Sequence, residues 1–143
     1  MDLDISHFCR DLVTGTADAI IYADSEGIIR FSNGGAVRIF GFAENEAVGQ
    51  SLDLIIPESL RERHWHGFDQ TMRTGESRYG AGDILAVPAL RKDSKRISVE
   101  FTILPFRGND GKIVGIAAIL RDATVRFEQT RALQRELAAL RAK

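Results

Sequence analysis

The chain has 143 residues, 44% of them hydrophobic, with 19 basic and 20 acidic residues. This length fits one domain with its own core, and the near-neutral charge argues against a general nucleic-acid binder, which would carry a basic stripe. The single cysteine, Cys9, excludes an intramolecular disulfide and favours a reducing compartment. The sequence shows no signal peptide, and no apolar run reaches the ~18 residues that span a bilayer. We therefore expect a cytoplasmic protein without membrane contact.

Hydrophobic periodicity predicts five strands and several helices. In chain order, the expected elements are a helix at 3–13, strands at 19–24 and 28–32, short helices at 33–42 and 44–48, a longer helix at 57–74, strands at 79–89, 95–106 and 113–120, and a helix from 124 to the end. Asn33 is a suitable N-cap, and Gly41 a suitable stop, for the first short helix. The fold class is α+β, with a five-stranded antiparallel sheet, short helices on one face, and N-terminal and C-terminal helices.

The strand at 95–106 alternates between apolar and polar side chains, which is typical of an antiparallel sheet with one wet face. The apolar members, which we expect to face the helices, are Ile97, Val99, Phe101 and Ile103. The closing strand contains small residues, which we expect to leave room between the sheet and the helices: Gly115, Ala117 and Ala118. A space between the sheet and the helices can hold a ligand or be filled by side chains, and the sequence leaves both possibilities open.

The last helix carries an apolar stripe formed by Leu133, Leu137 and Leu140. An exposed stripe of this kind seeks a partner, so we expect a homodimer through the terminal helices. The alternative is that this helix folds back on its own sheet. The expected organisation is an N-terminal amphipathic helix at 1–15, a core at 16–122 and a C-terminal signalling or dimerisation helix at 123–143.

Several short motifs, in this order and spacing, resemble those of PAS domains. They are the segment 33–42 followed by Glu46 to Gly49, the turn 90–94 in which Ser94 replaces the family's usual glycine, and the segment 121–124, which is similar to the Asp-x-Thr motif before an outgoing helix. The resemblance covers residues 8–128 and implies a PAS fold with a sensory role in bacterial signal transduction, as in two-component systems. It implies no enzymatic activity, and the sequence carries no nucleophile elbow, phosphate loop or paired metal-ligand motif.

Two functions of a PAS domain stay open at this stage. The first is a module that couples ligand or cofactor occupancy of an internal pocket to the C-terminal helix or a dimer, and so to a downstream signalling protein. The second is a PAS domain without cofactor that acts as a protein–protein dimerisation module. The chain is either a stand-alone PAS protein or a piece of a larger sensor.

The helix that begins at Pro57 is the most informative about a cofactor. Its segment 57–64 resembles the heme-binding helix of FixL-type oxygen sensors, in which Pro-Glu-x-x-Arg-x-Arg-His ends in the ligand of the heme iron. The resemblance implies heme b as the first candidate cofactor and His64 as its metal ligand. Flavin comes second, because Leu52 stands where the light-sensing branch of the family has its flavin-reactive cysteine. FixL-type sensors also carry an arginine on the next strand, where this chain offers Asp83.

Helical spacing places His64 on an inward face. A buried imidazole needs a partner, because an unpaired polar group costs ~1–3 kcal/mol, and that partner is either iron or a carbonyl or carboxylate of the core. The candidate cofactor-binding residues are Leu60, His64, Phe68, Met72, Ile103, Ile116 and Ala118. We expect Trp65 to cover an edge of the core, His66 to be solvated and Cys9 to be a small buried hydrophobe.

Overall fold

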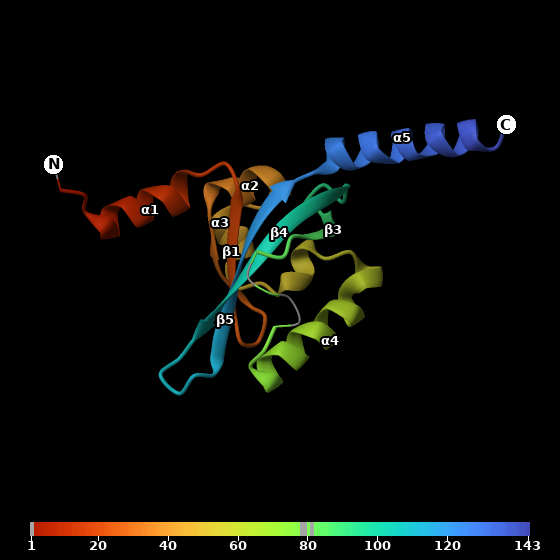
Figure 1. Ribbon diagram of the computed structural model, residues 1–143. Coiled ribbons are helices and arrows are strands. Elements are labelled where there is room, and N and C mark those ends of the chain that lie inside the picture. Colours follow the sequence, from red (N-terminus) through yellow and green to blue (C-terminus); the bar gives the residue numbers. More distant parts are fainter. Residues whose placement is uncertain (1, 78–79, 81) are drawn as a thin grey trace.

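The computed structural model describes residues 2–77, 80 and 82–143, and one five-stranded antiparallel sheet forms its centre. The strand order is β2-β1-β5-β4-β3. The elements are α1 (Ile5–Gly15), β1 (Ala19–Asp24), β2 (Ile29–Ser32), α2 (Gly34–Phe40), α3 (Glu44–Ala47), the 3-10 helix η1 (Leu52–Ile55), α4 (Glu58–Thr74), β3 (Leu85–Leu90), β4 (Arg96–Arg107), β5 (Ile113–Asp122) and α5 (Thr124–Arg141). Helices α1 and α5 leave the same end of the sheet in opposite directions (Figure 1). No helix in the described part of the chain is long and apolar enough to cross a membrane.

The alternation predicted for β4 is confirmed. Ile97 and Val99 are 7% and 1% exposed and belong to the core, and Phe101 packs against it. The buried cluster combines the inner face of the sheet with α2, and consists of Ala19, Ile21, Ile29, Ala36, Phe40, Ala89, Ile97, Val99 and Leu120. The core therefore lies between α2 and the sheet, at the end from which α1 and α5 depart.

The buried side chain of Asn33 joins α1, β1 and α2. Its oxygen accepts hydrogen bonds from the backbone N–H groups of Ile20 at 2.8 Å and Ala36 at 3.0 Å. Its amide nitrogen donates to the carbonyl oxygens of Val13 at 2.8 Å and Asp18 at 3.1 Å. The bond from Ala36 is the predicted N-cap of α2. The other three bonds fix the end of α1 against the start of β1.

The strand expected at 79–89 is shorter than predicted, because β3 begins only at Leu85. Tyr79 and Ala81 lie outside the described residues. Gly82 has a φ of +87°, and the Asp83 carboxylate accepts a hydrogen bond from the Gly80 N–H at 2.8 Å. The glycines and this aspartate make a turn where the residue pattern suggested a strand.

The small residues of β5 do not all face the helices. Ala118 packs against the core cluster on the inner face. Ala117 pairs with Tyr22 on the outer face, and the Tyr22 ring occupies the space that a Cβ at Gly115 would need. The expectation that all three residues leave room on the helix side is therefore wrong for Gly115 and Ala117. Their side of the strand accommodates Tyr22 instead.

The two end helices stand away from the domain. Neither α1 nor α5 contains a buried residue, and Leu133 and Leu140 are 65% and 66% exposed. The alternative in which the last helix folds back on its own sheet is therefore wrong (Figure 1). Cys9 lies exposed on α1, so the expectation of a buried cysteine is also wrong.

Ser94 adopts a left-handed backbone conformation at the position where PAS domains usually have glycine. Its φ is 68°, and it is the one non-glycine residue with positive φ in the described part of the chain. The turn is closed by hydrogen bonds from the Ser94 N–H to the Arg91 carbonyl and from the Arg91 N–H to the Lys95 carbonyl, both at 3.0 Å. An L-residue in this conformation costs about 1–2 kcal/mol, which glycine avoids.

Replacement of Ser94 by glycine should raise the free energy of unfolding by about 1 kcal/mol, because the left-handed penalty is removed while glycine adds some entropy to the unfolded chain. Urea unfolding measures this change. The matched control is Ser25→Gly in the β1–β2 turn, where the serine does not have positive φ and glycine should not stabilise. If Ser94→Gly is no more stable than the unmodified chain, the left-handed conformation carries no penalty there.

Candidate ligand-binding site

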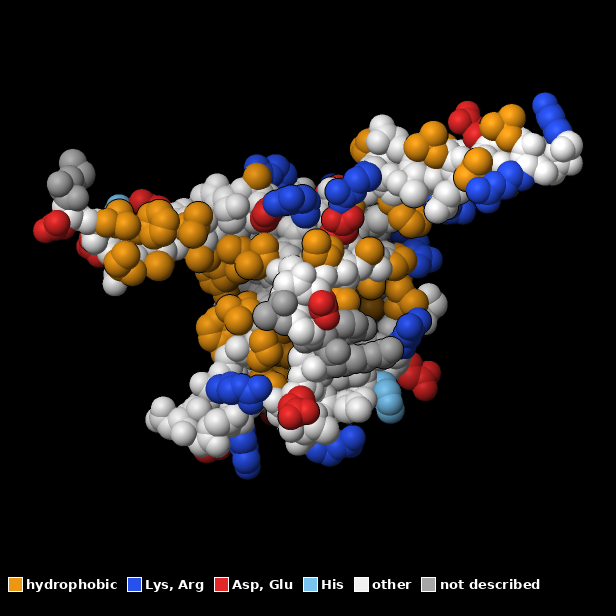
Figure 2. Space-filling model, viewed as in Figure 1, with side chains coloured by type: hydrophobic (Ala, Val, Ile, Leu, Met, Phe, Trp, Pro, Cys, Tyr) orange, Lys and Arg blue, Asp and Glu red, His pale blue; other side chains and the backbone are white. Residues whose placement is uncertain are grey.

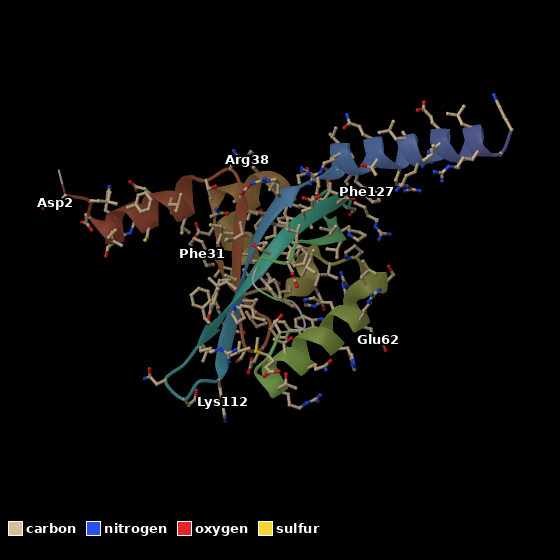
Figure 3. All side chains as sticks on the ribbon, viewed as in Figure 1. Asp2, Phe31, Arg38, Glu62, Lys112 and Phe127 are labelled. Atoms are coloured by element: carbon tan, nitrogen blue, oxygen red, sulfur yellow. The ribbon has the colours of Figure 1, made fainter. Side chains whose placement is uncertain are left out.

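One side of α4 is turned inward and is mostly apolar. The residues that share this side are Leu60, His64, Phe68 and Met72. Phe68 is buried, whereas the other three are half-buried. Glu62, on another side of α4, is exposed and points away from the sheet (Figure 3). The helix thus has the orientation that its sequence predicts, and the role of these residues in binding stays a prediction.

The sheet contributes the other three predicted residues from neighbouring strands. Ile103 on β4 is paired with Ala118 on β5, and Ile116 on β5 is paired with Ala23 on β1. These pairings place Ile103, Ile116 and Ala118 on the inner face, which also carries the core. All three are half-buried, whereas Val99 further along the same face is 1% exposed. The inner face is therefore less completely covered at these residues than at the core.

A ring nitrogen of His64 is buried without a hydrogen-bond partner. No donor or acceptor in the described part of the chain reaches Nδ1. The ring centroids of Trp65 and Phe68 lie 4.7 Å and 5.9 Å from that of His64. Burial lowers the pKa of His64, although the negative charges of Asp53 and Asp69 act in the opposite direction. The imidazole is therefore neutral at neutral pH, and a neutral imidazole is the form that ligates metals.

Trp65 and Arg61 fix the N-terminal half of α4. Trp65 Nε1 donates to Asp53 Oδ1 at 2.7 Å, and the indole ring occupies the space that a Cβ at Gly27 would need. Arg61 donates through Nη2 to the Asp53 carbonyl at 3.2 Å and through Nε to the Ile56 carbonyl at 3.0 Å. Helix α4 is thus held to η1 and to the β1–β2 turn, and Trp65 covers an edge of the domain as predicted.

His64 is isolated from other potential metal ligands. His66 is exposed, as predicted, and Asp83 is exposed and bonded to a backbone N–H in its own turn. Across residues 2–77, 80 and 82–143, no group of three or more His, Cys, Asp or Glu side chains is placed to hold a metal ion. A metal at His64 would therefore need a group that brings most of its own ligands, as a porphyrin does.

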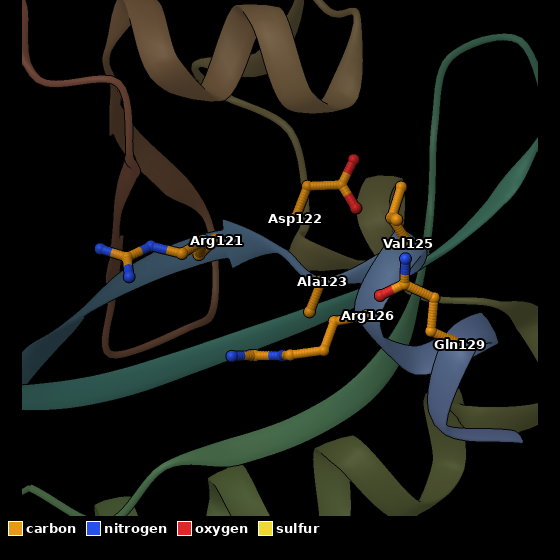
Figure 4. A pocket seen from close by; sticks show the side chains of 6 residues that line it. All are labelled: Arg121, Asp122, Ala123, Val125, Arg126 and Gln129. Atoms are coloured by element: carbon orange, nitrogen blue, oxygen red, sulfur yellow. The ribbon is translucent and has the colours of Figure 1, made fainter. Parts of the chain in front are cut away.

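The first turn of α5 is hydrogen-bonded to β4. Thr124 Oγ1 accepts from the Ser98 N–H at 3.0 Å, and Asp122 Oδ1 accepts from the Thr124 hydroxyl at 2.6 Å and N–H at 2.9 Å. Arg126 forms an ion pair with Glu100 on β4. A surface hollow lies at this joint (Figure 4), lined by Arg121, Asp122, Ala123, Val125, Arg126 and Gln129.

A second connection ties the end of β5 to the residue before β1. Arg121 donates through Nη2 and Nε to the two carboxylate oxygens of Asp18, at 2.9 Å and 3.1 Å. These hydrogen bonds are the largest cause of the lowered pKa of Asp18. The sequence indicated the Asp-x-Thr segment but not its partners Ser98, Glu100 and Asp18, because those partners are distant in the chain and only the sheet register brings them together.

Comparison with known proteins places the chain in a family. The family model described as "PAS domain" matches residues 17–125, so the chain belongs to the PAS domain family. The PAS domain of a protein from Colwellia psychrerythraea has the same fold, with a TM-score of 0.71 and 22% identity, over 85% of this chain and 98% of that one.

Two relatives are sensor proteins. Sensor protein FixL of Bradyrhizobium diazoefficiens is 30% identical over 129 residues, which cover 90% of this chain and 25% of FixL. Oxygen sensor protein DosP of Escherichia coli is 29% identical over 108 residues, which cover 73% of this chain and 13% of DosP. The chain thus matches a quarter or less of the length of each relative.

Because His64 is buried as a neutral imidazole, the free energy of unfolding should fall in acid. Because the native pKa lies below the ordinary value of 6.5, the unfolded chain takes up the proton first as pH decreases. Above the ordinary pKa, titration of His64 should leave the free energy of unfolding unchanged. As the pH falls from 6.5 toward the native pKa, the free energy of unfolding should decrease. Denaturant unfolding between about pH 7.5 and 5 measures the effect.

The matched variants are His64→Leu, which should flatten this part of the pH profile, and His66→Leu, which should keep it because His66 is exposed. An equal slope in His64→Leu and the unmodified chain would show that another group causes the acid sensitivity.

Proposed function

We propose that this PAS domain is a sensory module in which a cofactor lies between α4 and the inner face of the sheet and alters α5. The buried, unpartnered Nδ1 of His64 is the observation that carries the proposal. Leaving such a nitrogen unpaired costs ~1–3 kcal/mol, and a ligand that bonds to it would relieve this cost. Heme is the first candidate and flavin the second.

Heme fits the residues present. His64 would be its protein ligand, as a neutral imidazole without competing carboxylate hydrogen bonds. The porphyrin would lie against the half-buried apolar side chains of the two surfaces and the buried Phe68: Leu60, Phe68, Met72, Ile103, Ile116 and Ala118. When bound, heme supplies an iron that takes small gases such as O₂. The name of DosP, an oxygen sensor, supports a gas signal as the first one to test.

Flavin is second because of Leu52. This residue begins η1 and packs against the core cluster. It stands where the light-sensing branch of the family has a reactive cysteine, and a leucine forms no thioether. A flavin bound here would therefore act without a cysteine adduct.

The output we propose is α5. Ile103 and Ala118 lie on β4 and β5, and the same two strands carry Ser98 and Asp122, which hold the first turn of α5. A group pressing on the inner face would shift these strands relative to each other and so the direction of α5. The receiver is a downstream signalling protein or a second copy of the chain.

A PAS domain without cofactor that acts as a dimerisation module is the alternative function. The exposed apolar stripes of α1 and α5 favour it, because both need a partner to leave water. The absorption spectrum of the purified protein separates the two functions. Heme or flavin bands support the sensor, and protein absorbance alone, before and after addition of either cofactor, supports the dimerisation module.

Hemin titration tests the role of His64. The unmodified chain should develop a Soret band at one heme per chain, and His64→Ala should lose or shift it because the iron loses its protein ligand. His66→Ala is the matched control, an exposed histidine on the same helix, and should bind like the unmodified chain. Added imidazole should restore the band position in His64→Ala by replacing the missing ring. If the unmodified chain takes up no heme, or if His64→Ala gives an identical spectrum, His64 is not an iron ligand.

A further inference from the structure

Helix α4 is fastened to different parts of the domain at its two ends. Trp65 and Arg61 hold its N-terminal half to η1 and the β1–β2 turn. At the C-terminal end, Arg107 Nη2 donates to the carbonyl oxygen of Gly75 at 2.8 Å. This end of α4 lies beside the β4–β5 hairpin (Figure 1). The two halves of α4 are therefore held by separate contacts.

The local structure of β4 aims Arg107 at the end of α4. This residue continues the inner-face alternation of β4, and the pairing with β5 becomes irregular between Phe106 and Arg107. Irregular pairing of this kind re-aims side chains at the ends of strands. Arg107 Nη1 also donates to the Gly111 carbonyl in the hairpin turn at 3.0 Å, which orients the guanidinium. A cation is favoured beside the last carbonyls of a helix, because the helix dipole is negative there.

Gly67 lies in α4 between these two attachments. It is exposed in the middle of the helix, and a Cβ added there would have open space around it. At the edge of the molecule where α4 lies, Figure 2 shows charged and histidine side chains, so the outward side of α4 faces water. Packing therefore does not require glycine at this position. Glycine weakens a helix interior relative to alanine, because it leaves the backbone more freedom.

The half of α4 beyond Gly67 covers the proposed site. Phe68 is 8% exposed and Met72 is half-buried, and both belong to the inward side that the cofactor would contact. A group as large as heme or flavin cannot pass a buried side chain. It reaches the space between α4 and the sheet only if this half of the helix moves.

We propose that the C-terminal half of α4, residues 67–74, is a gate that opens about Gly67 to admit the ligand, and that Arg107 is the latch that holds the gate closed. Opening breaks the bond to Gly75, whereas the attachments of the N-terminal half remain. His64 lies in the attached half, so its imidazole keeps its place while the gate moves. The inference rests on the proposed ligand site beneath α4, but the motion does not depend on which group binds.

Hydrogen exchange of the full chain without cofactor tests the hinge and the latch. Arg107→Gln should speed exchange of the amides of residues 71–75 about fivefold, the effect of one hydrogen bond of average strength. Gly67→Ala should slow exchange of the same amides about fivefold, as the difference in helix propensity implies. The amides of β5, which lie in the core, should not change in either variant.

The matched controls are Arg96→Gln, an exposed arginine at the other end of β4, and Gly15→Ala, an exposed glycine with open space at the end of α1. Neither should alter exchange in residues 71–75. Unchanged exchange of these amides in Arg107→Gln would show that Arg107 is not a latch. An equal change in β5 would show that the variant alters only the stability of the whole domain.

Stopped-flow mixing with hemin tests whether the gate is the route of entry. Arg107→Gln should speed both uptake and release of hemin, and Gly67→Ala should slow both. The dissociation constant should stay the same, because the bound and unbound forms share the latch. His64→Ala should speed release alone, because it removes a contact with the ligand and leaves the route unchanged.

Two outcomes separate the gate from the proposed function. If exchange changes as expected and the rates of hemin uptake do not, the gate is not the entrance and the inference is wrong. If the chain takes up no hemin, the proposed heme site fails, while the exchange of residues 71–75 still decides whether Gly67 and Arg107 form a hinge and a latch.

Discussion

The side-chain amide of Asn33 makes four hydrogen bonds in the interior of the domain, and these bonds fix how the N-terminal helix leaves the sheet. A buried amide is costly unless its donors and acceptors are paired, so the arrangement of α1, β1 and α2 around Asn33 is strongly specified. Helix α5 begins at the same end of the sheet. There Arg121 donates hydrogen bonds to the carboxylate of Asp18, whose backbone carbonyl accepts from Asn33. Both end helices are therefore anchored to one rigid corner while their apolar stripes remain exposed. This geometry suits a domain that acts on a neighbour.

The opposite end of the inner face is built differently. Around Val99 the side chains are closely packed, whereas Ile103 and Ala118 on the same face are half-buried, and α4 contributes one buried residue, Phe68. Helix α4 is held at its N-terminal half by Trp65, whose bond to Asp53 does not depend on the sheet. The contacts that fix this half of α4 thus lie at η1 and the β1–β2 turn. The unpaired nitrogen of His64 is the main physical argument for a bound group.

Much of the fold could be predicted from the sequence, because its signals are local. Asn33 and Gly41 mark the ends of α2 with their own chemistry, and the alternation of β4 follows from its exposed and buried faces. Predictions that depended on sheet register were less successful. Gly115 makes room for Tyr22 on the outer face, and composition alone does not say on which face of a strand a small residue lies. The position of β3 was misjudged because glycines and Asp83 form a turn with no periodicity to reveal it.

In the candidate site, too, the local features could be predicted from the sequence and the contacts between distant segments could not. The inward side of α4 follows from helical spacing, so the neighbours of His64 on its own helix were foreseeable. The lack of a partner for Nδ1 was not, since it depends on which groups of distant segments fail to reach the ring. The bonds that join α5 to Ser98 on β4 were hidden for the same reason. Tertiary contacts between distant residues decide both the candidate binding surface and its proposed connection to α5.

Hydrogen exchange of backbone amides, with and without hemin, tests most directly whether occupancy of the site reaches α5. Heme binding should slow exchange in α4 and should alter exchange in β4 near Ser98 and in the first turn of α5 after Thr124. These changes should be absent in His64→Ala. Changes confined to α4, or equal changes in His64→Ala, would contradict the proposed coupling between the site and the output helix.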